Sequence, residues 1–189
     1  MNIIQKLPEE LQVQIYRDML VQELIQDQID LVNAIPEGIR HISFPSEKVQ
    51  LAAMYHNGQL IQYIKDPSEK VQLAAVTQNE HIIQLLEDPS EKVQLAAVSK
   101  YGFLIRCIKD PSISVQLAAV TKDSYAIQLI QDPPISVQLA AVTKDPCSIQ
   151  HISFPSEKVQ LAAVTRSYDS IKYIRNPSEK VSEVSEISK

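Results

Sequence analysis

The sequence has no tryptophan, three glycines, two cysteines and an aromatic fraction of only 5%. Three glycines are too few for a β protein rich in tight turns. A core without tryptophan must be built from Ile, Leu, Val and Ala, and the hydrophobic fraction of 44% allows one. Because Cys107 and Cys147 form no CxxC motif, we expect neither a zinc site nor a disulfide framework, and the protein suits a reducing compartment.

An excess of positive charge is also lacking, since the formal net charge is −5. This charge disfavours a general binder of nucleic acid or of an anionic membrane. No apolar run approaches the roughly 18 residues that a membrane-spanning helix needs, and acidic residues come too early for a signal peptide. We therefore expect a soluble, cytoplasmic protein with no membrane partner, acting in the host cytoplasm if it is viral.

Catalytic motifs are missing as well. The histidines show no metal-ligand spacing such as HExxH, and the sequence has no Gly-rich phosphate loop. Ser and Asp are abundant, but they recur at positions where helices need caps. We therefore expect no enzymatic activity, no cofactor and no metal site.

The sequence does contain a repeated phrase, DPSEKVQLAAV, in full at Asp66–Val76 and Asp88–Val98. The prolines of successive copies are 22 residues apart: Pro45, Pro67, Pro89, Pro111, Pro133, Pro155 and Pro177. A fixed period of this length is typical of stacked repeat arrays. Each repeat is numbered below from its proline, which is position 1.

The first half of the repeat predicts an α-helix that runs to about position 11. Asp66, Asp88 and Asp110 are candidate N-caps, proline suits the first helical position, and a Glu such as Glu69 falls where a capping box needs it. Positions 5 and 7–10 are Val, Leu, Ala, Ala and Val in most copies, so the helix is apolar nearly all round, which predicts burial on several sides.

A shorter second helix is expected after a variable turn at positions 12–15. Its core residues are Ile at position 17 and an apolar residue at position 20, such as Ile105 and Ile108. Neither helix is long enough to be stable alone, so each must stack on the next repeat.

These patterns predict an all-α fold, a right-handed α-solenoid of six 22-residue two-helix repeats over residues 44–175. Residues 1–43 are expected to form an N-terminal helical cap with a degenerate half-repeat, and a separate functional helix pair is the alternative. Residues 176–189 are expected to form a C-terminal capping helix. In that segment Glu183 replaces the Leu of position 7, while Val181, Val184 and Ile187 keep one apolar edge.

The element D-P-S-x-x-V-x-x-A-A-V at Asp66–Val76 resembles the D-x-x-x-x-V-R-x-x-V-A element of leucine-rich-variant repeats, and the array resembles short HEAT-like solenoids. It departs from that pattern because Gln replaces the Arg, the proline that often opens the second segment occurs only at Pro146, and the repeat is short. The resemblance covers Phe44–Lys189 and brings no catalytic residues. It implies binding of a protein or, in some members, of nucleic acid.

Equivalent positions of a solenoid form columns on its surface. Position 6 is always glutamine in the complete repeats: Gln50, Gln72, Gln94, Gln116, Gln138 and Gln160. We expect a structural amide ladder that bridges adjacent helices, because half-buried polar groups need partners. A row of amides on a binding face is the alternative.

A second column, at position 12, is basic in four repeats and lies beside aromatic residues. The basic residues are Lys100, Lys122, Lys144 and Arg166, and the aromatic ones are Tyr101, Phe103, Tyr125 and Tyr168. Cations with interleaved aromatic rings could follow a phosphate backbone or grip an acidic protein. They could equally complement the dipole at a helix C-terminus, and the two roles are compatible.

Two adjacent repeats have Ile-Ser in place of Glu-Lys at positions 3 and 4, which introduces Ile113 and Ile135. If exposed, the two isoleucines form an apolar spot suited to a partner or to self-association, and packing on the next repeat is the alternative. Position 19 varies, and we expect peripheral core rather than groove lining there: Tyr63, Leu85, Cys107, Leu129, His151 and Tyr173.

Together these features predict a non-enzymatic interaction scaffold or inhibitor that binds a partner protein through its repeat-built surface. The near-identical copies and the Ile-, Lys- and Gln-rich composition hint at a bacterial, phage or viral protein that acts on a host complex. A nucleic-acid-binding protein that uses the basic column is the alternative. A homodimer formed through Ile113 and Ile135 is the third hypothesis.

Overall fold

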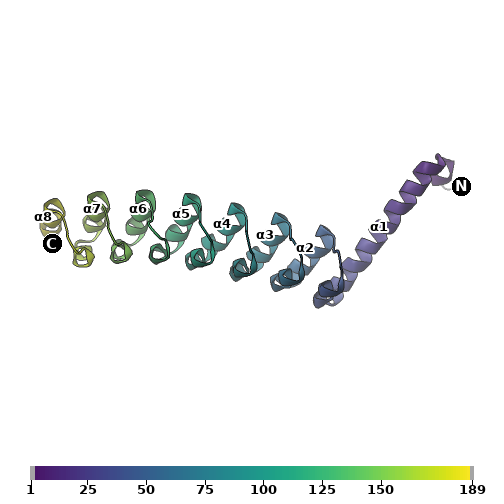
Figure 1. The fold of residues 1–189 in the computed structure, drawn as a ribbon, viewed down its shortest axis with the longest axis horizontal. Coiled ribbons are helices and arrows are strands. Elements are labelled where there is room, and N and C mark those ends of the chain that lie inside the picture. Colours follow the sequence, from purple (N-terminus) through teal and green to yellow (C-terminus); the bar gives the residue numbers. More distant parts are fainter. Residues whose placement is uncertain (1–2, 188–189) are drawn as a thin grey trace. The chain divides into compact units, whose positions relative to one another are not determined.

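The computed structural model describes residues 3–187, in which every regular element is a helix (Figure 1). The α-helices are α1 (Glu9–Ala34), α2 (Glu47–His56), α3 (Glu69–Gln78), α4 (Glu91–Lys100), α5 (Ile113–Lys122), α6 (Ile135–Lys144), α7 (Glu157–Arg166) and α8 (Glu179–Ile187). Between them lie 3-10 helices: η1 (Ile3–Lys6), η2 (Pro36–His41), η3 (Gly58–Tyr63), η4 (Glu80–Leu85), η5 (Gly102–Cys107), η6 (Ser124–Leu129), η7 (Pro146–His151) and η8 (Tyr168–Tyr173).

The chain divides into two compact units, the first ending at Gln78 and the second beginning at Asn79. In the first unit α1 packs on α2, and α2 packs on α3. In the second unit α4 to α8 pack in series, and each η helix also contacts the α-helix that follows it, as η5 contacts α5 (Figure 1). The all-α fold of helices packed in series is confirmed. The right-handed sense and the number of repeats remain predictions.

The core of each repeat is a small apolar set. In α5 it consists of Val115, Ala119 and Val120, which are fully buried, and the following η6 adds Ile127. Positions 5 and 9 are one helical turn apart and position 10 is the next residue, so these side chains cover adjoining parts of the helix surface. The Leu and Ala at positions 7 and 8 are only half-buried. The predicted burial on several sides is therefore complete only at positions 5, 9 and 10 and partial at positions 7 and 8.

The N-caps of α2, α4, α5 and α7 are serines and that of α6 is Pro134, so the predicted aspartate caps are wrong. The N-cap of α5 is Ser112, whose Oγ accepts a hydrogen bond from the backbone N–H of Val115 at 3.3 Å, and the N-cap of α4 is Ser90. Asp110 lies two residues before Ser112 and has a left-handed φ of 47°. Asp66 and Asp132 share this conformation, which a short polar side chain tolerates better than most.

The second segment of each repeat is a 3-10 helix that follows the α-helix after a single residue. In one repeat α5 ends at Lys122, Asp123 links the two helices, and η6 begins at Ser124. The expected turn at positions 12–15 is therefore wrong. Position 12 ends the α-helix and position 14 begins the 3-10 helix. The linking side chain caps the 3-10 helix in several repeats, as where Asp145 Oδ1 accepts from Cys147 N–H at 2.9 Å.

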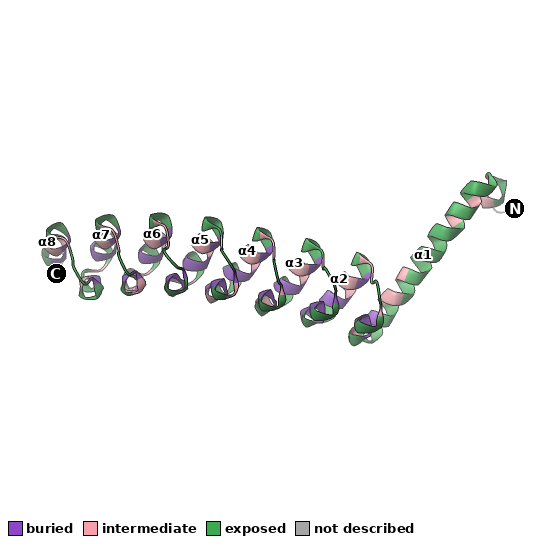
Figure 2. Ribbon diagram, in the orientation of Figure 1, coloured by how far each residue is buried: buried purple, intermediate pink, exposed green. Residues whose placement is uncertain are grey.

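The two end helices differ from the repeats between them. In α1 the only buried residue is Val32, and Figure 2 shows that most of this helix is exposed. In α8, Val181 and Ser185 are buried, whereas Glu183 and Glu186 are exposed. Ile187 is 86% exposed, so it does not pack as expected. Residues 188 and 189 of the predicted capping helix lie outside the described residues.

Candidate functional site

One pair of neighbouring repeats in each unit is linked by a hydrogen bond from the Ser at position 2 to the Glu at position 3 of the preceding repeat. Ser68 Oγ donates to Glu47 Oε2 at 2.7 Å, and Ser112 Oγ donates to Glu91 Oε1 at 2.6 Å. The bonds from Ser68 and from Lys70 hold the pKa of Glu47 below its ordinary value. We call this repeated contact the Ser–Glu ladder.

The Ser–Glu ladder is interrupted at α5 and α6. Ile113 and Ile135 occupy position 3 there, and they are 54% and 51% exposed. The residue that would bond to position 113 is Pro134, which has no hydroxyl group. The residue that would bond to position 135 is Ser156, whose Oγ is buried without a hydrogen-bond partner. The contacts of α5 with α6 and of α6 with α7 therefore lack the polar link, and each has an exposed isoleucine in place of the glutamate.

The two isoleucines belong to a larger apolar surface. Leu117 and Leu139 follow them by four residues, so they lie on the same helix faces, and they are half-buried. We call these four residues the α5–α6 patch. The first turns of α5 and α6 contain no acidic residue, whereas those of the adjacent α4 and α7 do. The N-cap of α5 still bonds to the Glu91 carboxylate, so only the positive end of the α6 dipole lacks an acidic residue both in its first turn and at its cap.

Side chains of the basic column bond within the array. Lys144 Nζ donates to the carbonyl of Thr121, near the end of the preceding α-helix, at 2.6 Å. Lys100 Nζ lies 3.9 Å from Glu80 Oε2. In the first unit, Gln78 occupies position 12 and donates in the same way to the carbonyl of Tyr55 at 2.9 Å. The expected role at helix C-termini fits these contacts.

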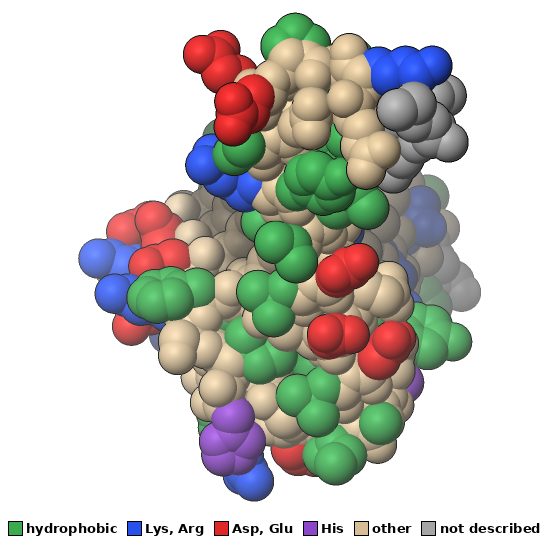
Figure 3. All heavy atoms as spheres, turned by 90° about the vertical axis from the view of Figure 1, so that its right-hand side faces the viewer, with side chains coloured by type: hydrophobic (Ala, Val, Ile, Leu, Met, Phe, Trp, Pro, Cys, Tyr) green, Lys and Arg blue, Asp and Glu red, His purple; other side chains and the backbone are tan. Residues whose placement is uncertain are grey.

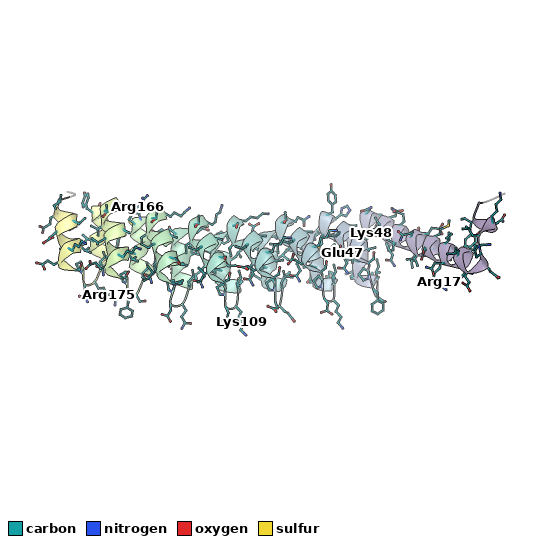
Figure 4. All side chains as sticks on the ribbon, turned by 90° about the horizontal axis from the view of Figure 1, so that it is seen from above. Arg17, Glu47, Lys48, Lys109, Arg166 and Arg175 are labelled. Atoms are coloured by element: carbon teal, nitrogen blue, oxygen red, sulfur yellow. The ribbon has the colours of Figure 1, made fainter. Side chains whose placement is uncertain are left out.

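Lys122 and Arg166 form no hydrogen bond or ion pair among residues 3–187 and are exposed. Figure 4 places Arg166 along one edge of the second unit and Lys109 and Arg175 along the other. The cations of this unit are therefore spread over two edges instead of forming one patch.

The aromatic residues beside the basic column are engaged to different degrees. Tyr101 contacts Phe103, with ring centroids 5.7 Å apart, and Tyr168 is exposed. Tyr125 is half-buried, and its ring meets that of His151 edge-on at 5.2 Å. Burial raises the pKa of Tyr125, and the charge and hydrogen bond of the Asp145 carboxylate raise it further. Tyr125 therefore ties two repeats together more than it presents a binding surface.

The ten predicted partner-binding residues do not form one site. Ile113 is the first residue of α5 and Lys122 is the last, and a ten-residue helix is about 15 Å long. The isoleucines thus lie at one end of the α-helices and the basic and aromatic residues at the other. A compact partner would contact one of the two groups first.

The glutamine column is structural, but it acts within each repeat. Each Nε2 donates to the carbonyl of its own repeat's proline, as Gln116 does to Pro111 at 2.9 Å. The same bond recurs in all six glutamines. The expected bridge between adjacent helices is not formed by these bonds, and the Oε1 atoms of Gln72, Gln116, Gln138 and Gln160 are buried. Buried amides of this kind cannot present a binding row.

Position 19 is a surface column, so the expected peripheral core is wrong there. Four of its residues are exposed, among them Leu85 at 53%, and Cys107 and His151 are intermediate. Both cysteines are unpaired. Among residues 3–187, no three His, Cys, Asp or Glu side chains gather closely enough to hold a metal ion. No α-helix in that range is sufficiently long and apolar to span a bilayer.

Two exposed features escaped the sequence analysis. The first is the apolar surface of α1, which includes Leu20 at 66% and Leu24 at 57% exposure. The second is the pair Phe44 and Phe154, exposed at 94% and 93%, which occupy the position that holds aspartate in most repeats. The identical segment HISFPSEKVQLAA around both phenylalanines was the signal available for the second feature.

Comparison of the chain with protein-family models, with curated proteins and with solved structures finds no match in any of the three. The resemblance to HEAT-like and leucine-rich-variant repeats therefore stays a prediction that rests on its residues alone.

Proposed function

We propose that the protein is a non-enzymatic scaffold or inhibitor that binds a partner protein through the α5–α6 patch. The observation that carries this proposal is the exposure of Ile113 and Ile135 at positions where the Ser–Glu ladder is interrupted. Exposed isoleucines lower the solubility of the protein, and a buried serine hydroxyl without a hydrogen bond lowers its stability. Residues whose placement lowers stability or solubility in this way are concentrated at functional sites.

The composition of the patch favours a protein partner. Apolar side chains at its centre and the Glu–Lys pairs of α4 and α7 at its sides give the apolar core and polar rim typical of protein interfaces. The N-terminus of α6, which has no acidic residue in its first turn, adds a preference for a partner that carries carboxylates near its apolar contacts. A cytoplasmic setting, and a phage, viral or bacterial source of the protein, belong to the same proposal.

Binding of nucleic acid through the basic column receives less support. Lys100 lies near a glutamate and Lys144 bonds to a backbone carbonyl, so both cations would have to leave a partner to reach a phosphate. Lys109 and Arg175 lie on the opposite edge of the unit, so they would not contact the same nucleic-acid strand as the basic column (Figure 4).

The test is a pull-down from a lysate, treated with nuclease, with the natural chain and two variants as baits. The first variant carries Ile113→Glu and Ile135→Glu, and glutamate is the residue found at this position in other repeats, so the fold is retained. The second carries Lys122→Glu and Arg166→Glu. Proteins that are retained would be identified and quantified by mass spectrometry.

We expect one dominant protein with the natural chain, at least tenfold less of it with the isoleucine variant, and little change with the basic variant. A tenfold loss corresponds to about 1.4 kcal/mol, a modest effect for central interface residues. Equal recovery by the isoleucine variant, or recovery that disappears on nuclease treatment, would refute the proposal.

A further inference from the structure

The half of α1 that precedes Ile25 carries an apolar stripe with no partner in its unit. Val13, Tyr16, Leu20 and Leu24 are spaced by three or four residues, so they line one face of the helix, and each is at least 43% exposed. These residues, with Arg17 and Val21, line a shallow hollow of about 500 Å³. We call the four apolar residues the α1 stripe.

The two end helices show which face receives a preceding helix. In α8, which packs on α7 and η8, the buried residues Val181 and Ser185 occupy positions 5 and 9. Val32 falls at position 10 when the 22-residue register is extended into α1, and it is buried where α1 packs on α2. Positions 5 and 9 therefore face the preceding helix, and position 10 faces the following one.

In α1 the receiving face is exposed and continues into the α1 stripe. Asp27 and Leu31 occupy positions 5 and 9, and both are exposed. Leu24 and Leu20 precede Leu31 by seven and eleven residues, that is by two and three turns, so they lie on the same side of the helix. The stripe is thus an extension of the surface by which helices of this array stack.

The charge of α1 selects the kind of helix that could cover this surface. α1 contains six carboxylates and one cation: Glu9, Glu10, Asp18, Glu23, Asp27, Asp30 and Arg17. Its formal charge is therefore −5, equal to that of the whole chain, so the other residues sum to zero. Figure 3 shows carboxylates together with apolar side chains on the side of the molecule where α1 lies.

A second copy of the chain is a poor occupant for the α1 stripe. Pairing of two α1 helices would bring the carboxylates of both helices together with only two arginines, and like charges at close range destabilise a helix pair. The outer side of α8 would not serve either, because it carries the exposed Glu183 and Glu186.

We propose that the α1 stripe is a docking surface for a basic amphipathic helix of another protein. The stripe runs from Val13 to Leu24, about 17 Å along the axis, so it accommodates roughly three turns of a partner helix. The partner would supply an apolar face with spacings of three and four residues, flanked by Lys or Arg that meet the carboxylates of α1. This site is independent of the α5–α6 patch.

The test uses the full chain and a synthetic helical peptide of 21 residues, with Leu at each a and d position of three heptads and Lys and Gln elsewhere. A peptide with Glu in place of every Lys is the matched control. Affinity would be measured by fluorescence anisotropy at physiological salt. The variants are Leu20→Glu and, as a control on another exposed apolar residue of the same unit, Tyr63→Ser.

We expect the Lys peptide to bind at least tenfold more tightly than the Glu peptide. Leu20→Glu should weaken this binding at least tenfold, whereas Tyr63→Ser should leave it unchanged, and circular dichroism should show that both variants keep their helix content. Equal affinity for the two peptides, or no effect of Leu20→Glu, overturns the proposal. So does self-association of the natural chain that Leu20→Glu abolishes, because the occupant is then a second copy.

Discussion

A serine hydroxyl and a glutamate carboxylate one repeat apart link neighbouring repeats at the scale of single residues. The link joins Ser112 to Glu91 at 2.6 Å and Ser68 to Glu47 at 2.7 Å. It is lost where position 3 is isoleucine, and Ser156 then keeps a buried hydroxyl without a partner. A buried polar group left unsatisfied costs about 1–3 kcal/mol.

The interruption of the Ser–Glu ladder predicts different outcomes for the same substitution, isoleucine to glutamate, at its two positions. Ile135→Glu should raise the free energy of unfolding by about 1 kcal/mol, because the new carboxylate can accept a hydrogen bond from Ser156 Oγ. Ile113→Glu should give no such gain, since the facing residue is Pro134. Thermal and urea unfolding midpoints of the two variants would decide this. Equal midpoints would mean that the Ser–Glu ladder does not stabilise the array.

The environment of Tyr125 predicts an unusual titration. Burial and then Asp145 raise its pKa, so in a titration followed by tyrosinate absorbance it should ionise above the ordinary pKa of a tyrosine. Asp145→Asn should lower the pKa of Tyr125, and Tyr125→Phe should remove the step that titrates above the ordinary value. Since the folded-state pKa is the higher one, the stabilisation is complete below the ordinary value of about 10 and is lost as the pH rises through the folded-state pKa. A Tyr125 that titrates at the ordinary tyrosine value of about 10 would contradict this account.

At the scale of the element, each repeat combines an α-helix that stacks on its neighbours with a 3-10 helix that closes the repeat. The α-helix begins after a serine cap in most repeats and after Pro134 in α6, and in three repeats an aspartate with positive φ precedes the helix. Left-handed backbone costs a residue with a side chain about 1–2 kcal/mol, and glycine adopts it without that cost.

This geometry predicts different results for two neighbouring residues of one cap. Ser112→Ala should destabilise the protein by about 1–2 kcal/mol, because it removes both the N-cap bond and the bond to Glu91. Asp110→Gly should be neutral or slightly stabilising, and Asp110→Val should be destabilising. Chemical unfolding midpoints would test the order of the three variants. If Asp110→Gly were as harmful as Ser112→Ala, Asp110 would have a capping role after all.

The sequence was sufficient to predict the elements that depend on periodicity. The prolines and the Val, Ala and Ile positions predicted an all-α array with the observed core, because a 22-residue period and helical spacing report directly on stacking. It could not show that Asp110 adopts positive φ while Ser112 caps, since both residue types suit a cap. It also could not distinguish a 3-10 helix from a short α-helix, because six residues fit both patterns.

The candidate surfaces could be predicted only in part from the sequence. The exposure of Ile113 and Ile135 was one of two alternatives, and the structure selects it. The lack of a hydrogen bond at Ser156 could be recognised only in the structure, because the bond it lacks would join residues of different repeats. The α1 stripe was missed because α1 is apolar on several sides, which in a sequence also fits a packed cap.

At the scale of the whole molecule, stability should be distributed unevenly along the chain. The first half of α1 buries little, and isolated helices shorter than about 12–15 residues are marginal in water. In hydrogen exchange followed by mass spectrometry, amides of residues 9–24 should exchange at least a hundredfold faster than those of α5 and α6. Equal protection would mean that α1 is already covered in solution, which the unit does not provide by itself.

The protein-binding role can be tested where the partner would sit, by photocrosslinking. A benzophenone side chain would be placed at position 113, in the α5–α6 patch, and in a second chain at position 122, at the other end of α5. After irradiation in lysate, we expect one dominant protein adduct from position 113 and little from position 122. An adduct formed only at position 122, or one that contains nucleic acid, would contradict the account.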